Sequence, residues 1–218
     1  MTLVALEVLL GHRDTVCDPA PTGRKASMDA STRVGDLVRA AAAGDPHGWN
    51  GLVERFAPLV WSTVRAYGLS LDEAANAAQT TWLQLAEQLD RIQREHDRVG
   101  VWLASTARRE SLRLLGLGRR HDAGAPREGG GSLAGAATAE PEREAMLWRV
   151  VRDLPEQCRR LLRILSTVPP PTHEEVAAAL DLRAAHVGSA RAACLEEFRR
   201  RMADIGIRAE VRDSRGIT

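Results

Sequence analysis

The sequence has few of the residues that favour β-structure. Aromatic side chains make up only 4% of the chain, with two Phe and one Tyr. Ala and Leu dominate the apolar content, and runs of β-branched residues are few, a composition that favours helix over sheet. We therefore expect an all-α fold. The length of 218 residues allows either one domain or two small ones.

Cysteine is also scarce, and none of the three cysteines stands in a pattern typical of a metal site. Cys17, Cys158 and Cys194 are odd in number and form no CxxC or His-and-Cys cluster, which favours a reduced, cytoplasmic location. We interpret Cys158 and Cys194 as buried core thiols. The apolar run 3–10 is too short to span a bilayer and lacks the flanks of a signal peptide, so we expect no membrane insertion.

Catalytic motifs are missing as well. The six histidines are scattered, and none belongs to an HExxH motif or stands beside a Ser or Cys in a nucleophile motif. The glycine run 129–131 lacks the Lys-Ser/Thr pair of a phosphate-binding loop. We expect no catalytic residues, no metal ligands and no cofactor.

The chain carries almost no net charge, formally +1 at pH 7, but the charge is unevenly distributed. Residues 29–97 hold ten acidic and six basic side chains, whereas residues 98–120 hold six arginines and one acid, Glu110. Clustered arginine commonly tracks the backbone of a nucleic acid, although it is also compatible with an ordinary solvated face. We favour phosphate contact for this stretch.

Four helices are expected in the first half of the chain. Asp45 followed by Pro46 provides a capping side chain and a first-turn proline. The segment 70–73 has the S-x-x-E form of a capping box. With the apolar spacing, these signals predict four helices: from residue 34 to before Gly44, 46–67, 71–89 and 99–115.

A helix-turn-helix arrangement is expected in the second half. Pro169–Pro171 ends a helix, and Thr172–Glu175 is a second capping box that opens a short helix, 174–180. A tight turn, 181–183, leads to a long helix, 184–202. A Gly- and Ala-rich stretch, 116–139, separates the halves and is interpreted as a flexible linker. The expected organisation is an N-terminal arm, a first domain, a linker, a second domain and a tail: residues 1–32, 33–117, 118–140, 141–203 and 204–218. Met28 is an alternative start to Met1.

Four segments, in this order and separated by the linker, resemble the sigma-70 family of RNA polymerase sigma factors. They read DEAANAAQTTWLQL (72–85), WLASTARRESLRLL (102–115), LPEQCRRLLRIL (154–165) and THEEVAAALDL (172–182). The resemblance covers residues 34–117 and 141–202. It is to the small extracytoplasmic-function (ECF) members, which keep only conserved regions two and four.

The resemblance implies a sigma factor that binds core RNA polymerase, through its β′ and β subunits, and directs promoter-specific transcription without chemistry of its own. The third helix would dock on the polymerase, through Asp72, Asn76, Gln79 and Trp82. The fourth helix and the loop before it would read and open the minus-ten element, through Arg94, His96, Arg98, Arg108, Arg109 and Arg113. The last helix would read the minus-thirty-five element, through Ala185, His186, Gly188, Ser189 and Arg191. An anti-sigma factor is a further partner that the resemblance suggests.

Two departures and several alternatives remain open. Asn76 stands where relatives commonly have Asp, and Leu103 follows Trp102 where primary sigma factors have a second aromatic residue. Trp82 could belong to the core, and we favour a core position for Trp102 over a platform for an unstacked base. The alternative function is a stand-alone helix-turn-helix regulator; a pure interaction protein would lack the arginine-rich helix.

Overall fold

The structure is a computed structural model that describes residues 34–92, 98–121 and 149–204. These ranges contain helices and turns and no strand, so the expectation of an all-α fold is confirmed. In chain order the helices are 34–42, α3 (Pro46–Ala66), α4 (Leu71–Ile92), α5 (Val99–His121), 149–153, α7 (Glu156–Leu165), α8 (His173–Leu180) and α9 (Ala184–Asp204).

The starts of α3, α4 and α8 follow from local capping, as the sequence predicts. Asp45 accepts a hydrogen bond from the backbone of His47 at 2.8 Å and opens α3. Ser70 and Glu73 satisfy each other's backbone donors at the start of α4. Thr172 and Glu175 form the same reciprocal box at α8. Each of these three starts is thus fixed by side chains within three residues of it.

Helix α5 is longer than expected. It continues to His121, through Gly116 and into the first residues assigned to the linker. Leu114 and Leu115 still pack against the core. This packing outweighs the helix penalty of glycine. The rest of the expected linker, the N-terminal arm and nearly all of the tail lie outside the described residues.

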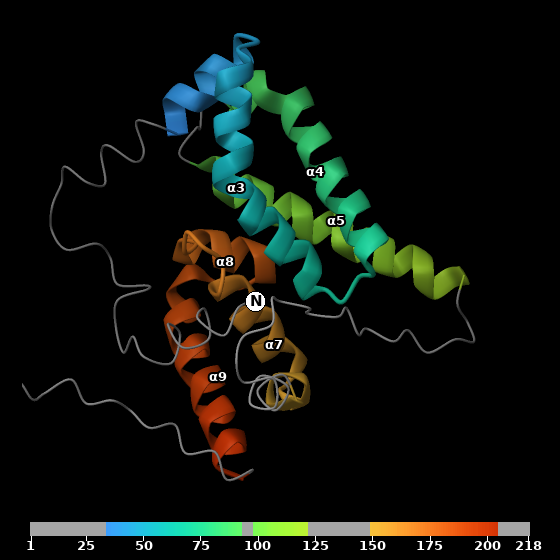
Figure 1. Cartoon of the computed structure of the whole chain (residues 1–218), viewed down its shortest axis with the longest axis vertical. Helices are drawn as coiled ribbons and strands as arrows, with labels where there is room; N and C mark the ends of the chain where they lie inside the picture. The colour runs from blue at the N-terminus through green and yellow to red at the C-terminus, as the bar shows by residue number, and fades with distance from the viewer. Residues whose placement is uncertain (1–33, 93–97, 122–148, 205–218) are drawn as a thin grey trace, which may run out of the picture.

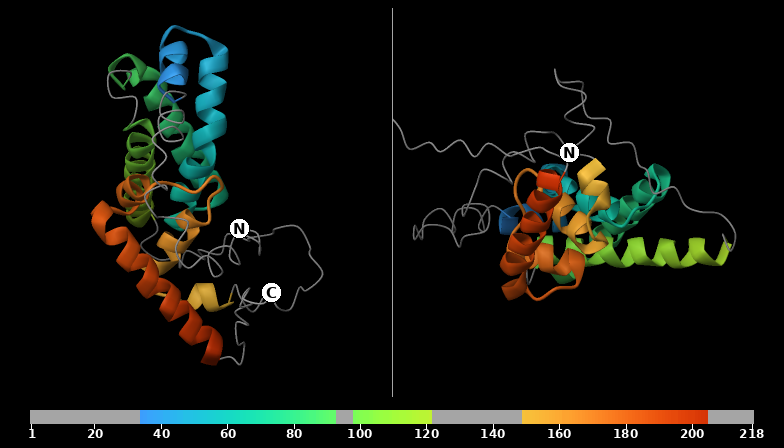
Figure 2. Two further views of the ribbon diagram at one scale, coloured as in Figure 1. Left: turned by 90° about the vertical axis from the view of Figure 1, so that its left-hand side faces the viewer. Right: turned by 90° about the horizontal axis from the view of Figure 1, so that it is seen from below.

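The two halves of the chain pack directly against each other. In Figure 1 the helices α3, α4 and α5 form the upper part, and α7, α8 and α9 lie beneath them, with α8 against α5 and α7 against α3. The left-hand view of Figure 2 shows the same stacking from the side. One hydrophobic cluster runs through both halves, from Val38 and Leu85 to Leu161 and Val187, all of which are fully buried. A second, smaller cluster lies between α7, α9 and the helix 149–153.

The prediction for Cys158 and Cys194 is wrong. They are joined by a disulfide between α7 and α9, with their Cα atoms 5.2 Å apart. Both do lie on the inner sides of their helices, as expected. Their separation of 36 residues gives no local sign of the pairing, which depends on how the two helices pack.

Candidate functional site

The exposed face of α4 carries three of the four residues predicted to meet the polymerase. Asp72, Asn76 and Gln79 are all exposed. Leu83 continues the same stripe and is 58% exposed. The opposite side of the helix is buried in the core. This stripe of polar residues ending in an apolar one suits contact with a protein partner.

Trp82 lies apart from that stripe. It is half-buried, packs against the core and meets the ring of Trp49 edge-on, with 6.1 Å between the ring centroids. Such a pair contributes to the packing of α4 on α3. Trp82 therefore has a structural role in this arrangement, the alternative that its sequence position left open.

Helix α5 presents Arg109 and Arg113 on its surface. Arg109 donates to the hydroxyl of Thr106 at 2.9 Å. Arg113 donates through Nε to Glu110 at 2.7 Å, and Gln84 of α4 donates to the other oxygen of Glu110 at 2.9 Å. Burial acts to raise the pKa of the Glu110 carboxyl, but the hydrogen bonds from Arg113 and Gln84 and the nearby arginine charges outweigh it and lower that pKa. One carboxylate thus orients Arg113 and ties α5 to α4.

Arg108 points elsewhere. Its side chain is only 21% exposed and forms an ion pair with Asp181, which caps α8 in the other half of the chain. Trp102, in the preceding turns of α5, is half-buried and packs against the core, in line with the core position favoured above. Among the remaining minus-ten candidates, Arg98 is exposed. Arg94 and His96 lie outside the described residues.

The helix-turn-helix unit consists of α8, the turn 181–183 and α9. Asp181 ends α8 with a left-handed backbone (φ 60°), which turns the chain toward α9. The first turn of α9 exposes all four of its candidate base-reading residues, Ala185, His186, Gly188 and Ser189. Val187 between them is fully buried and anchors the helix. This geometry leaves the N-terminal turn of α9 accessible.

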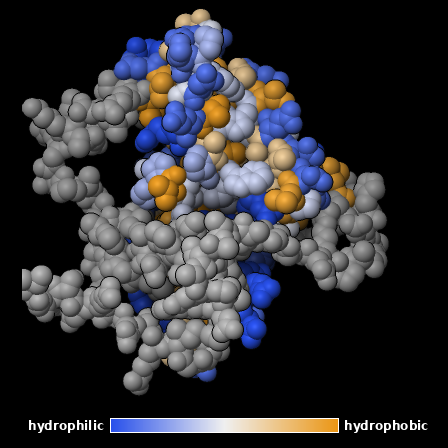
Figure 3. Space-filling model, viewed as in Figure 1, coloured by the Kyte–Doolittle hydropathy of each residue, from blue (hydrophilic) through white to orange (hydrophobic). Residues whose placement is uncertain are grey.

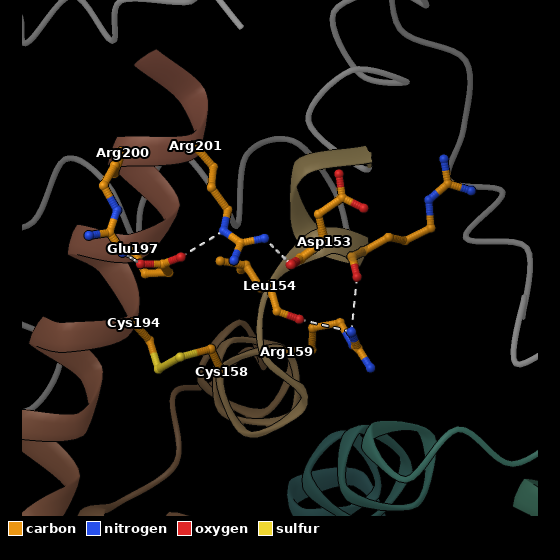
Figure 4. Close-up of polar contacts among 9 residues, drawn as sticks. Asp153, Leu154, Cys158, Arg159, Cys194, Glu197, Arg200 and Arg201 are labelled. Carbon is orange, nitrogen blue, oxygen red and sulfur yellow. Dashed lines mark hydrogen bonds and ion pairs between the residues drawn. A yellow bond between two sulfur atoms is a disulfide. The ribbon is translucent and has the colours of Figure 1, made fainter. Parts of the chain in front are cut away.

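Arg191 differs from those four residues because it is only 8% exposed. Arg200 and Arg201, further along α9, are engaged within the chain. Both form ion pairs with Glu197, and Arg201 also donates to the backbone oxygen of Asp153 (Figure 4). These contacts hold the end of α9 against the helix 149–153.

The contacts between the halves were not foreseen from the sequence. The hydroxyl of Tyr67, at the end of α3, donates to the backbone oxygen of Ala179 in α8 at 2.7 Å. The guanidinium of Arg160 in α7 lies 4.4 Å from the centre of the Tyr67 ring. Burial raises the pKa of the Tyr67 hydroxyl, against the opposing effects of Arg160 and Arg108. Tyr67 is the one tyrosine in the sequence, but nothing local marks its partner.

Close approach of the two halves also depends on a glycine. Gly100, in the first turn of α5, is buried. A methyl group added there would overlap the Glu175 carboxylate of α8 and come within 2.9 Å of the Phe56 ring. Glu175 thus closes the capping box of α8 while it sits over the start of α5. Only a residue without a side chain permits this contact.

A membrane span requires a long apolar helix, and a metal site requires several ligating side chains close together. On the face shown in Figure 3, the visible apolar patches are interrupted by hydrophilic residues. Within the described ranges, no helix combines the length and apolarity that a bilayer crossing requires. The same residues contain no group of three or more His, Cys, Asp or Glu side chains placed to hold a metal.

The first part of this site is similar to a known domain type. Residues 52–121 match the family model for Sigma-70 region 2. The match spans most of α3 and all of α4 and α5, about a third of the chain. The exposed stripe of α4 and the arginines of α5 therefore lie within the segment that is similar to Sigma-70 region 2.

The whole fold also has a counterpart among solved structures. It is similar to the structure of CnrH in complex with the cytosolic domain of CnrY, with a TM-score of 0.54 and 16% sequence identity. The similarity covers 80% of this chain and 99% of that chain, so it extends well beyond the region 2 domain. At this identity the likeness shows a shared fold. No curated protein sequence is significantly similar to this chain.

Proposed function

We propose that this protein is a sigma factor of the ECF type, which binds core RNA polymerase in the cytoplasm and directs it to specific promoters. The observation that carries the proposal is the Sigma-70 region 2 domain, with its arginine-bearing α5, followed by a helix-turn-helix unit. A stand-alone regulator needs only the second of these. The protein supplies no catalytic group; the polymerase does the chemistry.

The division of labour follows the exposed surfaces. The stripe Asp72, Asn76, Gln79 and Leu83 docks on the polymerase, since it is the exposed face of a helix otherwise buried in the core. Helix α5 holds the phosphates near the minus-ten element through Arg109 and Arg113, and Arg98 and Arg108 adjoin them. The first turn of α9 reads the minus-thirty-five element through His186, Ser189 and their exposed neighbours Ala185 and Gly188.

A protein inhibitor is part of this proposal. CnrH was solved in complex with the cytosolic domain of CnrY. By analogy with that pairing, an anti-sigma factor is a partner of this chain, and it would compete with the polymerase for the same surfaces. Binding of promoter DNA is weak without polymerase, because the chain carries a net charge of only +1.

The proposal is tested by separating docking from DNA opening. Gln79→Lys places a charge on the docking stripe and should reduce capture by core polymerase in a pull-down. The matched control is Asn50→Lys, the same charge change at an exposed position of α3, which should leave capture unchanged. If neither the parent nor the control is retained by core polymerase, the sigma-factor proposal fails.

Removal of the α5 arginines should affect a later step. Arg109→Ala combined with Arg113→Ala should assemble with polymerase yet form fewer open complexes, measured by permanganate footprinting, and the defect should grow as salt rises. Arg39→Ala combined with Arg55→Ala removes two exposed arginines from other helices of the same half and is the control. Normal opening by the α5 variant at every salt concentration would show that α5 does not hold the DNA.

A further inference from the structure

The disulfide between Cys158 and Cys194 joins two helices of the helix-turn-helix half. Figure 4 shows it between α7 and α9, one turn of α9 before Glu197. Cys194 is 5% exposed, whereas Cys158 is partly accessible at the surface of α7. The bond therefore links the helix that packs on α3 to the helix that carries the candidate base-reading turn.

The bond lies between the large core, of which Cys194 is a buried member, and the small cluster, against which Cys158 also packs. Cys158 packs against both the large core and the small cluster that holds α9 to α7 and to the helix 149–153. That small cluster has six buried members: Val150, Leu154, Leu162, Leu195, Phe198 and Met202. A core of this size contributes little stability by itself, and a cross-link that closes a loop of 36 residues contributes a large share.

The helix-turn-helix half keeps other stabilising contacts when the disulfide is reduced. Two thiols in these positions behave as small apolar side chains. Arg201 binds Glu197 and the backbone of Asp153, and these contacts do not involve sulfur. Loss of the bond should loosen α9 against α7 without unfolding the rest of the chain.

We propose that Cys158 and Cys194 form a reversible disulfide that sets the stability of the helix-turn-helix unit and, through it, use of the upstream promoter element. This inference rests on the proposed function, because a sigma factor works beside RNA polymerase in a compartment where thiols are normally kept reduced. A disulfide in such a compartment is typically a redox-responsive one.

The exchange reaction balances with a low-molecular-weight disulfide as oxidant. The thiolate of Cys158, the more accessible of the pair, attacks the external disulfide, forms a mixed disulfide and releases one thiol. The Cys194 sulfur then attacks Cys158, forms the internal bond and releases the second thiol. The two cysteines lose two electrons and two protons, and the external disulfide gains them as two thiols. Excess small thiol drives the reverse reaction.

The first experiment measures the bond and the stability of the full chain in glutathione buffers of graded oxidised-to-reduced ratio. Alkylation and mass spectrometry report one free cysteine in the oxidised chain, Cys17, and three in the reduced chain. The unfolding temperature of the chain is expected to rise by roughly 10 °C on oxidation. Cys158→Ala and Cys194→Ala should show no oxidant response, and Cys17→Ala should respond like the parent.

The second experiment measures transcription by core polymerase with the oxidised or the reduced chain. Promoters that depend on the upstream element should lose several-fold more activity on reduction than promoters from which it has been deleted. The proposal is overturned if the parent melts and transcribes equally in both states, or if glutathione buffers never reduce the bond. A redox-dependent melting shift with no transcription in either state would instead refute the sigma-factor function and leave the redox coupling of the fold in place.

Discussion

Glu110 contributes both to the packing of α4 on α5 and to the orientation of an arginine proposed to contact DNA. It is 9% exposed and accepts hydrogen bonds from Gln84 and Arg113, so it joins α4 to α5 while it orients an arginine proposed to hold phosphate. Because these contacts require the carboxylate, its pKa is lowered from the ordinary value of 4.5. The stabilising contribution is therefore present above about pH 4.5 and is lost as the pH falls through the lower folded-state pKa.

Substitution of this residue gives a prediction with a pH signature. Glu110→Gln should lower the free energy of unfolding by about 1–2 kcal/mol at pH 7, measured in urea. The difference from the parent should shrink as both are titrated below pH 4. Glu87→Gln, at an exposed position of α4, should change little at either pH. If the difference in the free energy of unfolding stays the same in acid, Glu110 contributes through its shape and not through its charge.

At the scale of the element, α9 divides its residues between surface and core. His186 is exposed in the first turn, whereas Arg191, little more than one turn further on, is buried. Substitutions at the two positions should therefore differ in kind. His186→Ala should keep the melting temperature and change the ranking of minus-thirty-five sequences, measured by competition binding of the assembled holoenzyme.

Arg191→Ala should instead act through folding. Removing a long side chain from the packed side of α9 is expected to cost about 1–3 kcal/mol of stability and to weaken all upstream sequences alike. Arg199→Ala, at an exposed position of the same helix, is the control. It should change neither the stability nor the binding of upstream sequences. A selective change in sequence ranking from Arg191→Ala, with an unchanged melting temperature, would restore it as a base contact.

At the scale of the whole molecule, the two halves form one packed body around α5 and α8. Gly100→Leu should separate them, because a side chain there displaces Glu175 and presses on Phe56. The expected result is a larger radius of gyration in X-ray scattering with nearly unchanged helix content. Gly116→Leu makes the same change in open space on the same helix and should scatter like the parent.

A second, milder variant tests the same contact in case Gly100→Leu fails to fold. Tyr67→Phe removes only the hydroxyl that reaches Ala179 and should weaken the docking by about 1 kcal/mol. Scattering curves of both variants that superimpose on the parent would show that the halves are held by other contacts.

The sequence predicts those features whose interacting residues lie within a few positions of each other in the chain. The caps at Asp45, Ser70 and Thr172 lie beside their partners, so the starts of α3, α4 and α8 could be placed. Tyr67 and Ala179 lie 112 residues apart, and no local pattern joins them. The disulfide and the burial of Arg191 depend in the same way on how the helices pack.

In the ion pair with Arg108, the Asp181 carboxylate occupies the guanidinium that a phosphate of promoter DNA would otherwise contact. Asp181 belongs to the same chain as its arginine and is held beside it by the packing of α8 on α5, whereas a DNA phosphate must arrive from solution. A DNA phosphate that approaches Arg108 must therefore compete with the Asp181 carboxylate for the same guanidinium. The contribution of Arg108 to DNA binding is reduced in proportion to the fraction of molecules in which the pair is closed. A partner that favours the open pair would raise that contribution without touching the DNA, and one that favours the closed pair would lower it.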